Sequence, residues 1–229
     1  MSAAVEAVLL DIEGTTSGTH VVVDVLYPYS RERIPALVAQ RGGEPAVASA
    51  VEHARQLMGE PPVDDDQVVT QLLSWLDADR KVTPLKSLQG IVWAEGFERG
   101  DLTSHFFPDA ADAIRDWHAQ GLKLFVFSSG SVAAQRSWFR YSDSGDMLPL
   151  ISGWFDTESA GPKVQPDSYR SIVADTGIQR MVFLSDRVSE LDAARAAGLQ
   201  TILVRRPGEP PGGEPGTHRV VASFDEVKL

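Results

Sequence analysis

The stretch Ala7–Thr16 reads AVLLDIEGTT, in which four apolar residues run directly into an acidic one. A continuous apolar run of this kind is typical of a strand in a parallel sheet, because such a strand is buried on both faces. Three later runs have the same form: Leu122–Phe127, Met181–Leu184 and Thr201–Val204. We therefore expect these four segments to be strands of one buried sheet.

Helical patterns separate the later strands. The expected helices are Asp109–Gln120, Ser131–Arg140, Asp167–Thr176 and Ser189–Ala197. Ser131 is a suitable N-cap, and the glycines Gly121, Gly177 and Gly198 provide stop signals. Alternation of strands and helices predicts an α/β fold with a Rossmann-like parallel sheet.

The interval between the first two strands is far longer than a crossover requires. A crossover needs about a dozen residues, whereas residues 19–99 show helical periodicity and no convincing strand. The helices expected there are Val25–Ala39, Pro45–Met58, Asp66–Leu76 and Pro84–Phe97. We expect residues 19–99 to form an inserted all-helical cap and residues 1–18 and 100–229 to form the Rossmann-like core. Lids of this kind exclude water and select the substrate.

Composition narrows the class of protein. The chain has 229 residues, 43% of them hydrophobic and 23% charged, as in a soluble globular protein. It has no cysteine, which excludes disulfides and thiolate metal sites, and its formal net charge of −11 opposes binding to nucleic acid. No apolar run approaches the roughly 20 residues that span a bilayer, and the first residues lack the features of a signal peptide. We expect a cytoplasmic protein that binds neither nucleic acid nor membranes.

Polar residues that could carry chemistry follow the apolar runs. Asp11 and Glu13 follow the first run, Ser128 and Ser129 the second, and Asp186 the third. In open α/β sheets, ligands bind outside the carboxyl ends of the strands, so these side chains are expected to meet. The loop that precedes the next helix adds a cation, Lys163, in the sequence GPKVQP.

Three carboxylates cannot share a small volume while ionised unless a cation neutralises them. Ligand sets made only of oxygen favour Mg²⁺. A carboxylate beside Mg²⁺ can attack phosphorus and form an aspartyl-phosphate, while lysine and serine side chains hold the other phosphoryl oxygens. The pattern therefore predicts phosphoryl transfer to a carboxylate.

Each of these residues also has an ordinary structural interpretation. Asp11 could cap a turn and Lys163 could be a surface lysine, so the prediction depends on their occurring together in this order. The five histidines show no spacing typical of metal ligands, and zinc is not expected. The Pro/Gly-rich segment Arg206–Gly216 (RPGEPPGGEPG) is interpreted as a turn-dense surface loop.

The order of these motifs resembles the haloacid-dehalogenase superfamily of phosphohydrolases. Within that superfamily, the chain resembles the enolase-phosphatase E1 family from about Val8 to about Phe224. The motifs that carry the closer resemblance are DIEGTT (11–16), LQG and IVW (88–93), SSGSVAAQ (128–135), WFDT (154–157), GPKVQPDSYRSI (161–172) and VRRPG (204–208). Glu13 is the most distinctive feature, because most phosphatases of the superfamily have a second aspartate there.

The resemblance implies a role for each residue. Asp11 would be the nucleophile and a ligand of Mg²⁺, and Asp186 would complete the metal set. Glu13 would contribute to the metal site, through its side chain or its backbone, and could act as general acid/base. Ser128 and Ser129 would bind the phosphate of the substrate. Lys163 would hold the charge of the nucleophile and the phosphoryl group.

The resemblance also places Glu190 in support of the metal site. It implies a monomer that acts on a small phosphorylated metabolite in methionine salvage. The reaction would enolise 2,3-diketo-5-methylthiopentyl 1-phosphate and then remove its phosphate, giving 1,2-dihydroxy-3-keto-5-methylthiopentene. Glu13 and a residue of the cap are both candidates for the group that abstracts the carbon-bound proton.

Four other functions are compatible with the same fold. One is a phosphatase of another small metabolite, such as a sugar phosphate or phosphoglycolate. A dehalogenase is disfavoured because it needs no metal, and a phosphonatase would need a Schiff-base lysine in the cap, where only Lys81 and Lys86 occur. A non-catalytic binding module is disfavoured by the complete set of site residues.

Overall fold

The chain folds into two compact units in a computed structural model that describes residues 4–59 and 63–229. The core unit runs to Thr19 and resumes at Thr103, and the helical unit comprises residues 20–102. Among the residues that the structure describes, no helix combines the length and the apolar character needed to cross a lipid bilayer.

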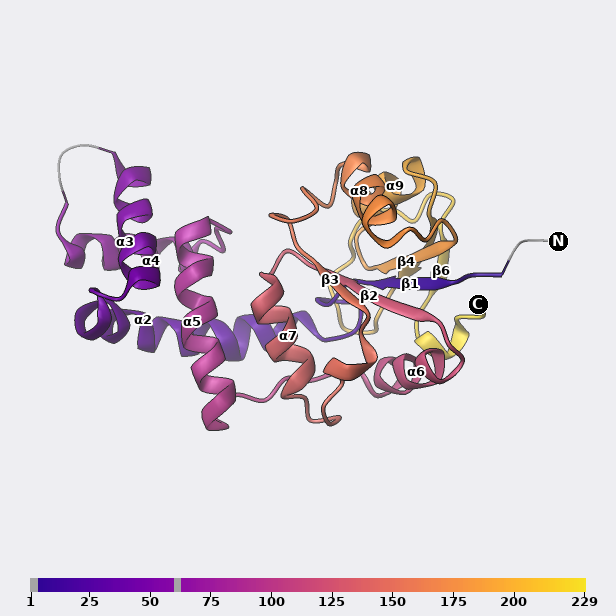
Figure 1. Ribbon diagram of the computed structural model, residues 1–229, viewed down its shortest axis with the longest axis horizontal. Coiled ribbons are helices and arrows are strands. Elements are labelled where there is room, and N and C mark those ends of the chain that lie inside the picture. Colours follow the sequence, from indigo (N-terminus) through magenta and orange to yellow (C-terminus); the bar gives the residue numbers. More distant parts are fainter. Residues whose placement is uncertain (1–3, 60–62) are drawn as a thin grey trace. The chain divides into compact units, whose positions relative to one another are not determined.

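A six-stranded parallel sheet forms the centre of the core unit, with the strand order β3-β2-β1-β4-β5-β6 (Figure 1). The strands, in chain order, are β1 (Ala7–Leu10), β2 (Lys123–Phe127), β3 (Gly153–Phe155), β4 (Met181–Ser185), β5 (Gln200–Val204) and β6 (Arg219–Val221). The chain passes from β1 outward through β2 to β3 and then returns to β4 on the other side of β1. This change of direction is the point at which open α/β sheets bind their ligands.

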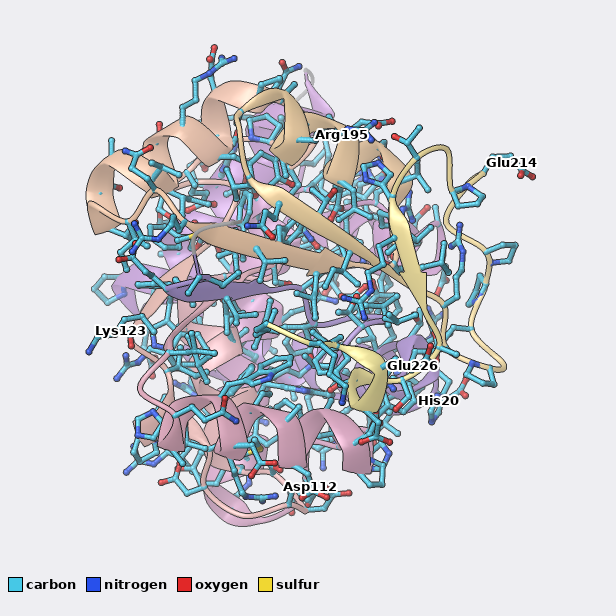
Figure 2. All side chains as sticks on the ribbon, turned by 90° about the vertical axis from the view of Figure 1, so that its right-hand side faces the viewer. His20, Asp112, Lys123, Arg195, Glu214 and Glu226 are labelled. Atoms are coloured by element: carbon cyan, nitrogen blue, oxygen red, sulfur yellow. The ribbon has the colours of Figure 1, made fainter. Side chains whose placement is uncertain are left out.

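Helices cover both faces of the sheet. They are α6 (Pro108–Ala119), α7 (Val132–Arg140), α8 (Pro166–Thr176) and α9 (Val188–Ala196). Helices α8 and α9 lie on one face, and α6 and α7 lie on the other (Figure 1). Figure 2 shows the two layers from one end of the sheet, with Arg195 on α9 above it and Asp112 on α6 below it.

The sheet is anchored by large apolar side chains. Leu9, Phe127 and Phe183 come from three adjacent strands and pack in one cluster with Tyr169 of α8 and Leu191 of α9. Each side chain of this size contributes roughly 1.5–3 kcal/mol when fully buried. The strands at the centre of the sheet therefore provide a rigid support for the loops that follow them.

The predicted α/β architecture is confirmed. Strands β1, β2, β4 and β5 agree with the four predicted segments to within one residue at each end. Ser131 caps α7 as expected, since its hydroxyl accepts a hydrogen bond from the backbone N–H of Ala134 at 3.3 Å. Strands β3 and β6 were not predicted, because each has three residues and lies at an edge of the sheet. Runs this short carry no reliable hydrophobic period.

The described residues of the helical unit contain no strand. A short helix, α1 (Thr19–Val21), leads through a π-helical segment, Val22–Leu26, into four longer helices. These are α2 (Tyr27–Arg41), α3 (Pro45–Met58), α4 (Asp65–Asp77) and α5 (Thr83–Arg99), which lie against one another (Figure 1).

The first predicted helix of this region began at Val25, whereas α2 begins at Tyr27. The difference arises from the π-helical segment, a rare conformation often found at functional sites. The interior of the unit is formed by Ile34, Val51, Leu72 and Leu88, all buried. The 3.6-residue period of the sequence places apolar side chains on one face of each helix, and that face is the one buried here.

Candidate active site

The polar residues expected in the site lie where three neighbouring strands end. Leu10 of β1 is paired with Val126 of β2 and with Leu184 of β4. Asp11 follows Leu10 directly, and Ser128 and Asp186 come two residues after those partners. Adjacent strands are about 4.8 Å apart, so the three residues leave the sheet side by side at the same edge.

Lys163 reaches this edge from the loop before α8 and forms a buried ion pair with Asp11. Its Nζ lies 2.7 Å from Asp11 Oδ1 and 2.7 Å from Glu190 Oε2, and its side chain is only 8% exposed. The backbone of Lys163 is also held, because the hydroxyl of Tyr169 donates to its carbonyl at 2.8 Å. Burial by itself lowers the pKa of Lys163, but the carboxylates of Asp11 and Glu190 raise it above its ordinary value. The ammonium group therefore stays charged.

Ser185 is a member of the site that the sequence analysis missed. Its Oγ lies 3.1 Å from Asp11 Oδ2 and 3.0 Å from Glu190 Oε2. A hydroxyl has one proton, so Ser185 donates to one of the two carboxylates at a time. Glu190 was expected only in a supporting position, and the structure places it in direct contact with Lys163. A serine at the end of a strand gives no spacing signal that would have identified it.

Asp186 lies against the loop that follows β1. Its backbone N–H donates to Thr15 Oγ1 at 3.0 Å, and a Cβ added at residue 14 would lie 2.8 Å from its Oδ2. Gly14, with a φ of +69°, is therefore required at this close approach. Burial, together with the carboxylates of Asp11 and Glu190, raises the pKa of Asp186 to about 7, and Lys163 and Arg187 only partly oppose this.

The charged side chains of the site together suit a divalent cation. Asp11, Glu190 and Asp186 bring three negative charges when ionised, and Lys163 brings one positive charge. Their oxygen atoms are the donors that Mg²⁺ prefers. A bound cation would relieve the repulsion that raises the pKa of Asp186.

The side chains of Asp11, Glu13 and Asp186 do not form a three-carboxylate cage. Within residues 4–59 and 63–229, no three His, Cys, Asp or Glu side chains are arranged as a ready-made metal site. Glu13 is paired through its backbone with Ser17 in an isolated bridge. Mg²⁺ is commonly held by one or two carboxylates, with water and substrate phosphate completing its shell. The observed arrangement fits that mode of binding.

Ser128 and Ser129 lie in the loop that leads from β2 into α7. The backbone N–H of Ser128 donates to the carbonyl of Phe155 at 3.2 Å, and Gly130 N–H lies 3.3 Å from Ser128 Oγ. Gln135 holds the loop from the helix side, because its Nε2 donates at 2.8 Å to the carbonyls of both Gly130 and Phe155. These bonds keep the two serines next to the first turn of α7, where backbone N–H groups favour anions.

Asp156, in the WFDT motif, fixes the start of the same helix. Its Oδ2 accepts from the backbone N–H of Val132 at 2.9 Å, and its Oδ1 accepts from that of Ser159 at 2.8 Å. Burial raises the pKa of Asp156, but these hydrogen bonds outweigh burial and lower it below its ordinary value. The carboxylate is therefore a charged structural anchor for the serine loop, a role that its position in the sequence did not indicate.

One edge of the sheet thus combines the parts needed to transfer an anionic group. It has a carboxylate held by an ammonium group, hydroxyl and N–H groups at the start of a helix, and excess negative charge suited to a cation. A carboxylate in such a position can act as a nucleophile, and the cationic and N–H groups can stabilise charge on the transferred group.

Comparisons with known proteins give consistent results. Residues 5–198 match the family model described as haloacid dehalogenase-like hydrolase. The chain is 58% identical over 228 residues to enolase-phosphatase E1 of Streptomyces avermitilis, with 98% of this chain and 95% of that protein covered. It is 48% identical over 222 residues to enolase-phosphatase E1 of Pseudomonas syringae pv. syringae, with 96% of each covered.

Solved structures share the fold of this chain. The crystal structure of the UTR4 protein of Saccharomyces cerevisiae has a TM-score of 0.80 and 33% sequence identity, and it covers 98% of this chain and 100% of that one. The crystal structure of CbbY from Rhodobacter sphaeroides in complex with phosphate shares the fold, with a TM-score of 0.63 and 19% identity over 97% of this chain and 96% of that one.

Proposed function

The chain belongs to the haloacid dehalogenase-like hydrolases and, within them, to the enolase-phosphatase E1 family, and from this we propose that it is a Mg²⁺-dependent enolase-phosphatase. It would convert 2,3-diketo-5-methylthiopentyl 1-phosphate into 1,2-dihydroxy-3-keto-5-methylthiopentene and inorganic phosphate, a step of methionine salvage. The observation that carries the proposal is the buried contact of Asp11 with Lys163 beside Asp186, in a chain this similar to named enolase-phosphatases.

In the proposed phosphatase step, a carboxylate oxygen of Asp11 attacks phosphorus. The bond between phosphorus and the substrate oxygen breaks, and that oxygen takes a proton from Glu13. Water then attacks the phosphorus of the aspartyl-phosphate and returns a proton to Glu13. This second attack releases inorganic phosphate and restores the Asp11 carboxylate, so the hydrolysis is divided into two easier steps.

The other side chains would orient the reacting groups and balance their charge. Lys163 keeps the Asp11 carboxylate in place and compensates negative charge on the phosphoryl oxygens, which Ser128 and Ser129 would bind. Asp11, Glu13 and Asp186 would hold Mg²⁺. The ion supplies Lewis acidity for both the enolisation and the phosphoryl transfer.

We further propose that the helical insertion, residues 19–99, acts as a cap that admits the substrate and excludes water. Its helical character and its place in the chain, after the loop that carries Asp11, support this role. We propose that the protein acts as a cytoplasmic monomer on this small metabolite.

The direct test is turnover by the purified protein. Chelator-treated protein is mixed with the diketo phosphate, with and without added Mg²⁺, while phosphate release and the absorbance of the acireductone product are followed together. We expect both signals to appear only with Mg²⁺. A sugar phosphate and phosphoglycolate serve as comparison substrates.

Two outcomes would contradict the proposal. Phosphate release without acireductone absorbance would identify a phosphatase of another metabolite. No release from any ester, with Mg²⁺ present, would favour a non-catalytic binding protein.

A further inference from the structure

The segment that follows β5 contacts both of the loops that carry the carboxylates of the site. We call residues 205–213 the β5 loop. Arg206 Nε donates to the carbonyl of Thr15, in the loop after β1, at 3.0 Å. Arg205 Nη1 donates to the carbonyl of Asp186, in the loop after β4, at 3.1 Å. Two consecutive arginines therefore hold two different loops of the site. The rest of the segment is turn-dense and mostly exposed, as expected of a surface loop, whereas Arg206 is buried.

Arg206 is buried to an extent that is unusual for an arginine. Its side chain is 4% exposed, and its Nη1 lies 2.5 Å from Asp109 Oδ2. Its Cζ lies 4.4 Å from the ring centroid of Phe107 and 4.8 Å from that of Phe224, so the guanidinium is held between two aromatic rings. Its Nη2 is buried with no hydrogen-bond acceptor among the described residues.

A buried charged side chain with an unsatisfied donor is not needed for packing alone. An apolar side chain of similar volume is often as stabilising as a buried ion pair or more so. What the guanidinium offers in addition is a charged donor to the carbonyl of Thr15, and such charge-assisted hydrogen bonds are roughly twice as strong as neutral ones. This contact is the feature that an apolar replacement could not reproduce.

The contact with Thr15 extends to Asp186. Thr15 is fully buried, and its Oγ1 accepts the hydrogen bond from the backbone N–H of Asp186. The next residue of the β1 loop, Thr16, is held as well, because the backbone N–H of Phe107 donates to its carbonyl at 2.9 Å. Arg206, Thr15 and Asp186 thus form one continuous series of contacts between the β5 loop and the two carboxylate loops.

The β5 loop also closes against the residues after β4. The backbone N–H of Val188 donates to the carbonyl of Gly212 at 3.1 Å. A Cβ at residue 212 would lie 2.1 Å from the carbonyl oxygen of Asp186, so only glycine permits this approach. Arg205 donates in addition to the carbonyl of Gly213. The loop therefore leaves Asp186 little freedom to shift.

We propose that Arg206, together with Arg205, is a positioning residue that sets the spacing of the β1 and β4 loops and thereby the affinity of the site for Mg²⁺. The inference rests on the proposed function, because Mg²⁺ is part of that proposal. Mg²⁺ requires near-ideal octahedral geometry with oxygens at about 2.0–2.1 Å. A small displacement of Asp186 relative to Asp11 would therefore weaken its binding.

The test compares variants at Arg206 with a matched arginine at the other end of the sheet. Arg206→Met removes the donor to Thr15, and Arg206→Lys keeps a charge near Asp109 without the planar fork. Arg180→Met is the control, because Arg180 Nε also donates to a backbone carbonyl, that of Ala4, at 2.8 Å. Mg²⁺ binding to the chelator-treated proteins is measured by calorimetry, and backbone mobility is measured by hydrogen exchange of residues 14–17 and 186–188.

We expect Arg206→Met to raise the dissociation constant for Mg²⁺ by about tenfold or more, the usual effect of losing a residue that supports metal ligands. Exchange in residues 14–17 and 186–188 should become faster. Arg206→Lys should change both quantities in the same direction by less. Arg180→Met should change neither.

If Arg206→Met does not fold, Mg²⁺ affinity and hydrogen exchange are measured on Arg206→Lys and Arg205→Met instead. A folded Arg206 variant with wild-type Mg²⁺ affinity and wild-type exchange would overturn the inference and leave Arg206 a purely structural residue. Failure of the proposed function would be seen separately. In that case the wild-type protein binds Mg²⁺ but releases no phosphate, and weaker Mg²⁺ binding by Arg206→Met would still support the positioning role.

Discussion

The two ends of the central sheet consist of the same strands and differ in how they accommodate charge. At the amino end, Glu6 and Arg180 form an ion pair whose side chains are 45% and 46% exposed. Lys123 lies exposed at the start of β2, as Figure 2 shows. At the carboxyl end, the side chains of Lys163 and Asp11 are 8% and 6% exposed, and their charges face one another out of water.

The exposed ion pair at the amino end and the buried ion pair at the carboxyl end differ in how strongly the protein depends on them. An exposed ion pair contributes about 0–1 kcal/mol and tolerates the loss of a partner. A buried pair depends on both of its partners, because the remaining charge has no water to solvate it. The buried charges are gathered at the end of the sheet where we place the chemistry, so substitutions there should have much larger effects than those at the amino end.

The largest effect is expected for Asp11→Asn. We expect activity to fall by at least about 10⁴-fold, the order of loss seen when a catalytic group that acts in a covalent mechanism is removed. The fold should be preserved, because Lys163 keeps Glu190 as a partner. Phosphate release and thermal unfolding are measured on the same preparation. A folded variant with activity near that of wild type would exclude Asp11 as the nucleophile.

The next largest effect is expected for the stability of Lys163→Met. The variant leaves Asp11 and Glu190 buried without their cation, which should cost about 3–5 kcal/mol of unfolding free energy. Adding Glu190→Gln in the same chain should restore part of the loss, since it removes one of the two uncompensated charges. Urea denaturation of the single and double variants in chelator measures both. Equal stability of wild type and Lys163→Met would contradict the view that this end of the sheet depends on paired charges.

An intermediate, pH-dependent effect is expected for Asp109→Asn. Burial raises the pKa of Asp109, but hydrogen bonds from Arg206, from the backbone of Phe224 and from Ser223 outweigh burial and hold it below the ordinary value. The folded state therefore binds this proton less readily than the unfolded state does. The ionised carboxylate thus adds stability that is complete above the pKa of the unfolded chain and is lost as the pH falls through the lower pKa of the folded state.

We expect Asp109→Asn to lose about 1–3 kcal/mol of unfolding free energy at pH 7, the usual range for a hydrogen bond to a charged group. The difference from wild type should shrink as the pH falls below about 4. Urea denaturation at a series of pH values gives this comparison. A difference that stays constant down to the lowest pH would show that the charge of Asp109 does not matter.

The smallest effect is expected for Arg180→Met at the amino end. Loss of its exposed pair with Glu6 should change the unfolding free energy by less than about 1 kcal/mol and leave turnover unchanged. Denaturation and the phosphate assay check both. A loss as large as that of Lys163→Met would remove the contrast between the two ends.

The sequence predicted the centre of the fold because its strands are buried on both faces. Such strands leave uninterrupted apolar runs, as in Ala7–Leu10 and Met181–Ser185. The edge strands β3 and β6 have three residues each, and their pairing depends on neighbours far away in the chain. The π-helical segment Val22–Leu26 likewise has no sequence pattern of its own.

The sequence indicated which residues share one edge of the sheet, but not which atoms each of them contacts. Asp11, Ser128 and Asp186 could be expected together because each follows a buried strand, and parallel strands end at one edge. The functions of Ser185 and Arg206 depend on which carboxylate or backbone carbonyl each one reaches, and that is decided by the folded chain. Motif resemblance marked the VRRPG segment, but it did not show that Arg206 lies buried beneath the β1 loop.

The most direct test of the account is a crystal structure of the protein with Mg²⁺ and trifluoroberyllate, a mimic of a phosphoryl group on a carboxylate. We predict beryllium bonded to the carboxylate of Asp11, its fluorine atoms close to Lys163 and the Ser128 loop, and Mg²⁺ in contact with both Asp11 and Asp186. An ion or a beryllium adduct bound at other residues, with the Asp11 carboxylate unmodified, would contradict it.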